Sequence, residues 1–298
     1  MPATSRRSLA PRALLVAALF SAFALSPALA RDPVVEAVRL ALQKADAAPA
    51  VAAGERAVAA RPKDADAWFY AGQAFGKMAM QASLVRKAGW AGKTREAFQQ
   101  AVTLDPDHLG ARQGLVQFYT MAPAIMGGGK DKAAAEIASF AARNAAGGHY
   151  LRASGLEGAQ AERELRAAVR LAPDETRYRA ALATHLERGK RSAEALAAID
   201  AGLARSPGDA RLLYLLGRHA AVHGQRADEG LAALDRLLAN TARLPDDVPA
   251  AGAHWRRGQL REKRGDASQA LADYRRAAAL APGLKDVKQD IARLGGTP

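Results

Sequence analysis

Residues 255–282 read WRRGQLREKRGDASQALADYRRAAALAP. Two runs with small and apolar residues at helical spacing flank the pair Gly265-Asp266, which is a turn signal. Pro282 ends the second run, because proline lacks a backbone N–H and clashes with the preceding helical turn. The segment therefore predicts a helix, a tight turn and a second helix.

The same ending recurs along the chain, where a small residue precedes a proline by five positions. Pro173 and Pro207 are 34 residues apart, and the other intervals fit one or two units of that length with short insertions. A helix–turn–helix unit of this length cannot bury its apolar face alone, so neighbouring units stack. The five pairs are Ala57 and Pro62, Ala101 and Pro106, Ala168 and Pro173, Gly202 and Pro207, and Ala277 and Pro282.

This unit resembles the tetratricopeptide repeat, whose first helix carries Trp, Leu-Gly and Tyr and whose second carries Ala, an aromatic and Pro. Leu216 and Gly217 match the Leu-Gly pair, and Tyr274 and Ala277 match the second helix. The resemblance implies an all-α fold: an α-solenoid of about seven helix-turn-helix repeats forming a right-handed superhelix with a groove lined by the first helices. Further matches are Trp68, Ala71, Gly72, Phe75, Phe98, Ala101, Pro106, Trp255 and Gly258.

The repeats divide residues 31–283 into seven expected units. A terminal segment, residues 284–298, has apolar residues on one side and polar residues on the other, which suits a capping helix and tail. The unit after Pro207 lacks a closing proline, so its end is the least defined. The expected units are 31–64, 65–108, 109–146, 147–175, 176–209, 210–249 and 250–283.

Residues 1–30 have the three-part plan of a secretory signal peptide. Three arginines and no acid precede an apolar run over residues 13–25, and a small-residue segment ends at Ala30. The apolar run is shorter than the roughly 20 residues that a spanning helix needs. We therefore expect cleavage before Arg31 and an exported, periplasmic protein without a stable membrane span, by a Sec-type signal more than a twin-arginine one.

Composition excludes several function classes. The 298 residues include no Cys, which removes disulfides, thiol nucleophiles and Cys-ligated metals. The net charge is +13, but the basic residues are spread along alternating helix faces and match no nucleic-acid module, so we expect no nucleic-acid partner. No nucleophile elbow or carboxylate pair stands out, so we expect no enzyme, no catalytic residues and no cofactor.

Two short motifs suggest binding chemistry only weakly. The run Gly127-Gly128-Gly129-Lys130 lacks the spacing and the Ser or Thr of a phosphate loop, so we interpret it as a flexible hinge between helices. His219 and His223 lie four apart on an expected helix and could share a metal, but the sequence suggests no third ligand. We therefore expect no metal site.

The second unit is longer than the standard repeat. We expect its first helix to be extended by about two turns and broken at Gly89 and Gly92. The aromatic residues concentrated here have two interpretations: a packing nucleus of the stack, or a recognition patch in which Trp90, with Arg86 and Lys87, contacts a partner.

The first helices, placed in register, predict a groove lined by cations, amides and aromatics without acids. Such a lining suits a protein or peptide partner with acidic character. We therefore expect a non-catalytic exported scaffold for protein–protein interactions, with a carrier subunit for an anionic small molecule or glycan as the alternative. The sequence names neither the partner nor the oligomeric state. The predicted groove residues are Arg177, Arg188, Arg211, Tyr214, Arg218 and Trp255.

Overall fold

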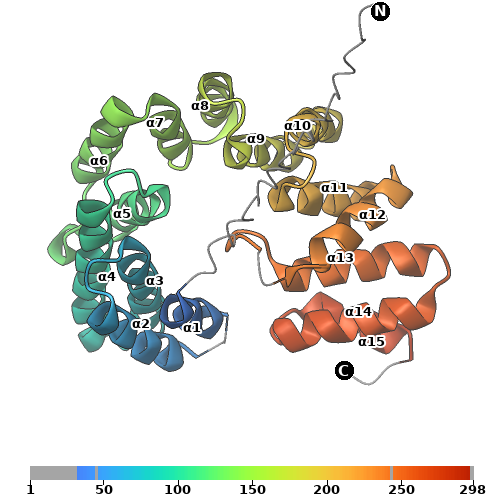
Figure 1. Ribbon diagram of the computed structural model, residues 1–298, viewed down its shortest axis with the longest axis horizontal. Coiled ribbons are helices and arrows are strands. Elements are labelled where there is room, and N and C mark those ends of the chain that lie inside the picture. The colour runs from blue at the N-terminus through green and yellow to red at the C-terminus, as the bar shows by residue number, and fades with distance from the viewer. Residues whose placement is uncertain (1–31, 44–45, 242–243, 296–298) are drawn as a thin grey trace, which may run out of the picture.

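The computed structural model describes residues 32–43, 46–241 and 244–295, and these ranges contain helices and no strands. Consecutive helices pack as pairs, and the pairs follow one another around an arc whose two ends face each other across a hollow (Figure 1). The predicted all-α solenoid is therefore confirmed. The expected signal peptide, residues 1–30, lies outside the described residues.

The first helices of the pairs are α1 (Pro33–Leu42), α3 (Ala65–Gln81), α5 (Leu109–Met121), α7 (Ala145–Ala153), α9 (Thr176–Arg188), α11 (Ala210–His223) and α13 (Ala250–Lys263). The second helices are α2 (Ala48–Ala60), α4 (Leu84–Leu104), α6 (Lys130–Arg143), α8 (Gly158–Leu171), α10 (Ser192–Arg205), α12 (Ala227–Leu238) and α14 (Ala267–Leu280). A short 3₁₀ helix, η1 (Ala124–Met126), lies between α5 and α6, and α15 (Lys285–Arg293) packs on α14 at the end of the described chain.

The prolines mark where one repeat unit ends and the next begins. Helices α2, α4, α8, α10 and α14 each end two residues before their proline, which confirms these prolines as helix stops. The residue two positions after each proline is the N-cap of the next helix. Asp64 accepts a hydrogen bond from the Asp66 N–H over 2.9 Å, and Asp209 accepts one from the Leu212 N–H over 3.0 Å. Each unit thus ends one helix and caps the next within a few residues.

Small residues allow the paired helices to approach closely. A Cβ added to Gly72 would lie 2.7 Å from the Phe98 ring, and one added to Gly258 would lie 2.5 Å from the Tyr274 ring. Gly217 faces Leu234 in the same way. These contacts require glycine because no side chain fits in the remaining space.

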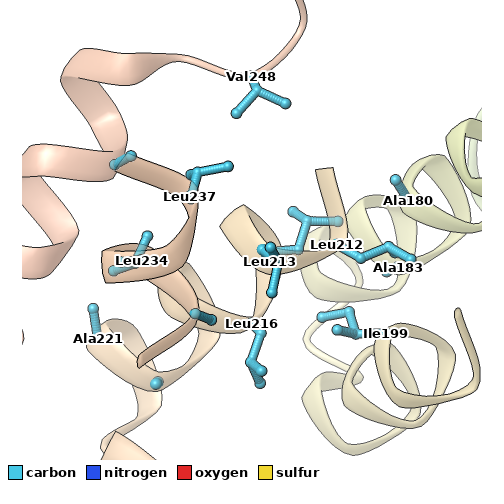
Figure 2. Packing of buried hydrophobic residues seen from close by; sticks show 14 of the residues in the cluster. Ala180, Ala183, Ile199, Leu212, Leu213, Leu216, Ala221, Leu234, Leu237 and Val248 are labelled. Atoms are coloured by element: carbon cyan, nitrogen blue, oxygen red, sulfur yellow. The ribbon is translucent and has the colours of Figure 1, made fainter. Parts of the chain in front are cut away.

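The largest apolar cluster joins the fifth, sixth and seventh units. Ile199, Leu212 and Leu234 are almost fully buried in it, and they come from α10, α11 and α12. Val248, from the loop that precedes α13, also belongs to this cluster, and Figure 2 shows it beyond Leu237, on the side away from Ala221. The loop is therefore anchored to the solenoid by apolar packing.

The insertion in the second unit differs from the expected structure. The helical conformation is interrupted at Ala82 and Ser83, where the backbone is extended between α3 and α4. Helix α4 then continues without interruption through Gly89 and Gly92. The prediction of a break at these two glycines was wrong. Each costs the helix about 1 kcal/mol, and the packing of buried residues such as Ala91 on the same helix offsets this cost.

One unit boundary and one loop also differ from expectation. Helix α7 begins at Ala145 with Asn144 as its N-cap, so the boundary expected between residues 146 and 147 falls inside its first turn. The glycine run expected as a flexible hinge forms a hydrogen-bonded turn, in which the Gly129 N–H donates to the Tyr119 carbonyl over 2.8 Å. No helix in the described part of the chain is long and apolar enough to cross a bilayer.

Candidate functional site

A cavity of about 770 Å³ lies between α7, α8, α9, α11 and the loop that precedes α13. Five of the residues predicted to line the groove surround it: Arg177, Arg188, Arg211, Tyr214 and Arg218. The lining also includes Tyr150 from α7 and Thr184 and His185 from α9.

Helical spacing explains why these side chains share one face. On α9, Arg177, Thr184 and Arg188 recur at intervals of seven and four residues, while Leu182 and Leu186 turn into the core. On α11, Arg211 and Arg218 are seven residues apart. The two helices belong to neighbouring units, so their polar faces meet at the cavity.

The cavity is rich in positive charge. Among the described residues, Arg177, Arg188 and Arg218 form no ion pair, whereas Arg211 donates from Nε to the Asp247 carboxylate over 2.6 Å. The Nε of Arg177 is buried without a hydrogen-bond partner. A buried guanidinium N–H without a hydrogen-bond partner lowers the stability of the folded protein. An anionic group that accepted a hydrogen bond from Arg177 would therefore be bound favourably there.

The pKa values of neighbouring groups reflect this environment. Burial raises the pKa of Tyr214, and the charges of Arg218 and Arg256 oppose that rise. Burial also lowers the pKa of Arg256, in the same direction as the repulsion from Arg218. The guanidinium groups of Arg218 and Arg256 therefore lie close enough to Tyr214 to act on its pKa.

The expectation of an acid-free lining was wrong. Asp247 and Glu157 both line the cavity. Both lie outside the first helices, Asp247 in the loop that precedes α13 and Glu157 at the N-cap of α8, so a register of first helices could not place them. The first-helix residues that line the cavity include no acid.

The loop before α13 extends toward the middle of the arc (Figure 1), and its residue Asp246 contacts the N-terminal units. The Tyr70 hydroxyl donates to the Asp246 carboxylate over 2.5 Å, and Arg39 lies 3.8 Å from the same carboxylate. A second cavity, of about 570 Å³, lies on this side of the loop, and Val248 and Pro249 border both cavities. The acidic loop thus divides the concave face.

The remaining predicted residues lie elsewhere. Trp255 donates from Nε1 to Asp290 over 2.8 Å and packs in the terminal cluster, outside the 770 Å³ cavity. Trp90 packs near Phe75, with ring centroids 6.0 Å apart, and the Lys93 ammonium lies 4.7 Å from its ring centre. These contacts give both tryptophans a packing role.

Arg86 and Lys87 lie in the first turn of α4, where Arg86 is exposed. They do not approach the 770 Å³ cavity. The nine predicted residues therefore divide into five that meet at the cavity and four that lie elsewhere.

Sequence reasoning missed a third group near His219 and His223. Glu187, on α9, accepts hydrogen bonds from both imidazoles, over 2.6 Å and 3.0 Å. Glu187 precedes His219 by 32 residues and His223 by 36, and the repeat length of 34 lies between these two values. The repeat period could therefore have predicted that Glu187 lies beside the two histidines.

The described helices repeat one arrangement of helix ends and close contacts. Five prolines, each two residues after one helix and two residues before the N-cap of the next, and glycines at the helix contacts, recur along the described array. The chain is a tetratricopeptide-like α-solenoid. This assignment concerns the fold, and the identity of a partner does not follow from it.

Comparisons with known proteins give structural similarity alone. No family model and no curated protein matches the sequence. A tetratricopeptide repeat protein from Parabacteroides merdae is 13% identical, with 88% of this chain and 98% of that one covered and a TM-score of 0.46. YrrB, described as a TPR protein with an unusual peptide-binding site, is 14% identical, with 84% and 100% covered and a TM-score of 0.36.

A third similar structure is the APC/C hetero-tetramer Cut9–Hcn1. It is 15% identical, with a TM-score of 0.49, and the match covers 83% of this chain and 48% of that one. At these identities the likeness concerns the fold alone.

Proposed function

We propose that this chain is a non-catalytic scaffold of the periplasm or cell envelope whose concave face binds an extended acidic segment of a partner protein. The observation that carries the proposal is the acidic loop of the chain itself. Asp247 binds Arg211 and Asp246 binds Tyr70, so this loop occupies the concave face through its carboxylates. The loop is thus an acidic segment of this chain that binds in the way proposed for the acidic segment of the partner.

The cations that remain support the same partner chemistry. Arg177, Arg188 and Arg218 line the cavity without ion pairs among the described residues. Guanidinium groups bind carboxylates through short, charge-assisted hydrogen bonds, often two at a time. A partner with several Asp or Glu residues would therefore find at least three further positions beside the loop.

The proposed location rests on the sequence. Residues 1–30 combine a basic start, an apolar run and a small-residue ending, which is typical of an export signal. The absence of Cys is compatible with an oxidising compartment because no thiol is at risk there.

A second function is favoured by the size of the cavity. About 770 Å³ is within the usual range for small-molecule pockets, and the buried Nε of Arg177 is a hydrogen-bond donor without a partner. An anionic small molecule or glycan is therefore the alternative ligand, with the chain as a carrier subunit.

In-cell crosslinking followed by capture of the tagged protein from its envelope extract tests both the scaffold function and the carrier function. The scaffold proposal predicts a reproducible protein partner that is lost when Arg177 and Arg218 are both changed to Glu. The matched control is Arg163→Glu with Arg170→Glu, which reverses two exposed charges on α8 and should retain the partner. A Trp90→Ala variant should also retain it.

Loss of the partner with the α8 control as well would contradict binding at the cavity. No protein partner, together with an anionic small molecule or glycan retained by the wild type and lost with the cavity variant, would support the carrier alternative.

A further inference from the structure

Three side chains capable of ligating a metal meet on the first helices of the fifth and sixth units. His219 Nδ1 lies 2.6 Å from one Glu187 oxygen, and His223 Nε2 lies 3.0 Å from the other. One ligand atom from each of the three residues lies within 4.8 Å of the other two. His219 is buried, whereas the His223 side chain is 30% exposed.

The repeat brings these residues together. A 34-residue period places Glu187 of α9 level with Ala221 of α11, which lies midway between the two histidines. His219 and His223 are four residues apart and so share one helix face, and their ring centroids are 4.6 Å apart. The geometry follows from stacking two ordinary repeats.

The chemistry of this cluster differs from that of two other histidine–carboxylate pairs. His149 pairs with Glu164, but Arg152 occupies the same carboxylate. His254 pairs with Asp273, which also binds two arginines. An arginine stays protonated and offers no lone pair to a metal. Among the described residues, Glu187 is the carboxylate that is shared by two imidazoles.

We propose that Glu187, His219 and His223 bind a divalent transition-metal ion, with zinc as the best-suited metal. Two imidazoles and one carboxylate are a ligand set typical of zinc, with water completing the tetrahedron. The exposed side of His223 gives that water access. The metal binds a ring nitrogen that carries no proton, so each neutral imidazole holds its one proton on the other ring nitrogen. Small side-chain rotations bring the three ligand atoms to zinc-bond distances of about 2.0–2.2 Å.

The surroundings set the strength of the site. Lys263 of α13 donates to the Ala221 carbonyl over 2.6 Å, so a cation lies beside the same turn of α11. The single carboxylate partly offsets this repulsion. The Nε2 atom of His219 has no hydrogen-bond partner, so no second residue orients this ring. We therefore expect a site of moderate affinity.

Isothermal titration of the purified, tag-free protein with zinc chloride tests the proposal. We expect one zinc ion per chain and weakening by at least about tenfold in His223→Ala and in Glu187→Gln. Cobalt should give the visible absorption of a four-coordinate ion in the wild type and lose it in both variants. The matched control is His149→Ala, which removes a histidine from a histidine–carboxylate pair that also contains an arginine.

The test does not depend on replacing the buried His219, a change that could unfold the chain. His223 is partly exposed, and Glu187→Gln preserves shape, so circular dichroism should show both folded. Absence of zinc binding by the wild type overturns the proposal. Binding that His223→Ala and Glu187→Gln leave unchanged, or that His149→Ala abolishes, overturns it as well, because the zinc then lies elsewhere.

Discussion

The Nε of Arg211 donates to Oδ2 of Asp247 across 2.6 Å, and this bond holds the loop before α13 against α11. The neighbouring residue Asp246 accepts a bond from Tyr70 of α3. Two adjacent carboxylates thus connect distant repeats through the concave face. The loop is bound as an acidic ligand while it remains part of the chain.

Replacing both loop acids should loosen the loop. In Asp246→Asn with Asp247→Asn, we expect amide hydrogen exchange over residues 244–249 to become about two- to fivefold faster, since each partly exposed hydrogen bond or ion pair of these carboxylates contributes about 0.5–1 kcal/mol. Mass spectrometry of the exchanged protein checks this. The control is Asp174→Asn, which removes the exposed pair with Arg205. Unchanged exchange in the loop would show that its carboxylates do not hold it.

Two glycine substitutions should have opposite effects on stability. Gly217→Ala places a methyl group against Leu234 and should lower the free energy of unfolding by about 1–3 kcal/mol. Gly89→Ala meets no atom within 4 Å in the helix interior and should raise it by about 0.5–1 kcal/mol. Urea denaturation measures both. The same sign for the two changes would be inconsistent with this packing.

Asp273 should make stability depend on pH. Burial raises its pKa, but hydrogen bonds from His254 and Arg257 outweigh that, so the folded pKa lies below the ordinary value. The carboxylate therefore stabilises the fold above about pH 4, and this contribution is lost as the pH falls through the folded pKa.

At neutral pH, Asp273→Asn should lower the free energy of unfolding by about 1–3 kcal/mol, because Arg257 and Arg261 lose the buried carboxylate and keep only the more exposed Asp235 as an anionic partner. Urea denaturation from pH 7 to pH 3 should show the gap to the wild type narrowing below about pH 4. A gap that widens on acidification would contradict the assigned pKa direction.

Export should leave a defined N-terminus. If residues 1–30 are removed as proposed, intact-mass measurement and N-terminal sequencing of the protein from the producing cell should give Arg31 as the first residue. Replacing Ala28 and Ala30 with bulky residues should block this cleavage. A chain that retains residues 1–30 in its native host would contradict the proposed location.

The sequence predicted the fold because its punctuation is local. Pro173 follows the last residue of α8 by two positions and precedes Glu175, the N-cap of α9, by two, so neighbouring residues mark both helix ends. The break in the second unit was misplaced because the packing of α4 outweighs the helix cost of Gly89 and Gly92.

The site was predictable only where the repeat itself defines it. Helical spacing placed Arg177 and Arg218 on the cavity side of their helices. Asp246 and Asp247 come from a loop whose path depends on Val248 entering the apolar cluster and on contacts with α3. No periodicity describes such a path, so the acidic loop emerged from the structure.

Titration of a fluorescein-labelled acidic peptide followed by anisotropy tests the central claim most directly. The account predicts saturable, salt-sensitive binding that is weakened at least about tenfold when Arg177 and Arg218 become Glu, and that Arg163→Glu with Arg170→Glu leaves intact. If the affinity falls equally in both variants, the peptide responds to the net charge of the protein and does not bind at the cavity. Absence of binding at low salt would contradict the concave face as a site for acidic segments.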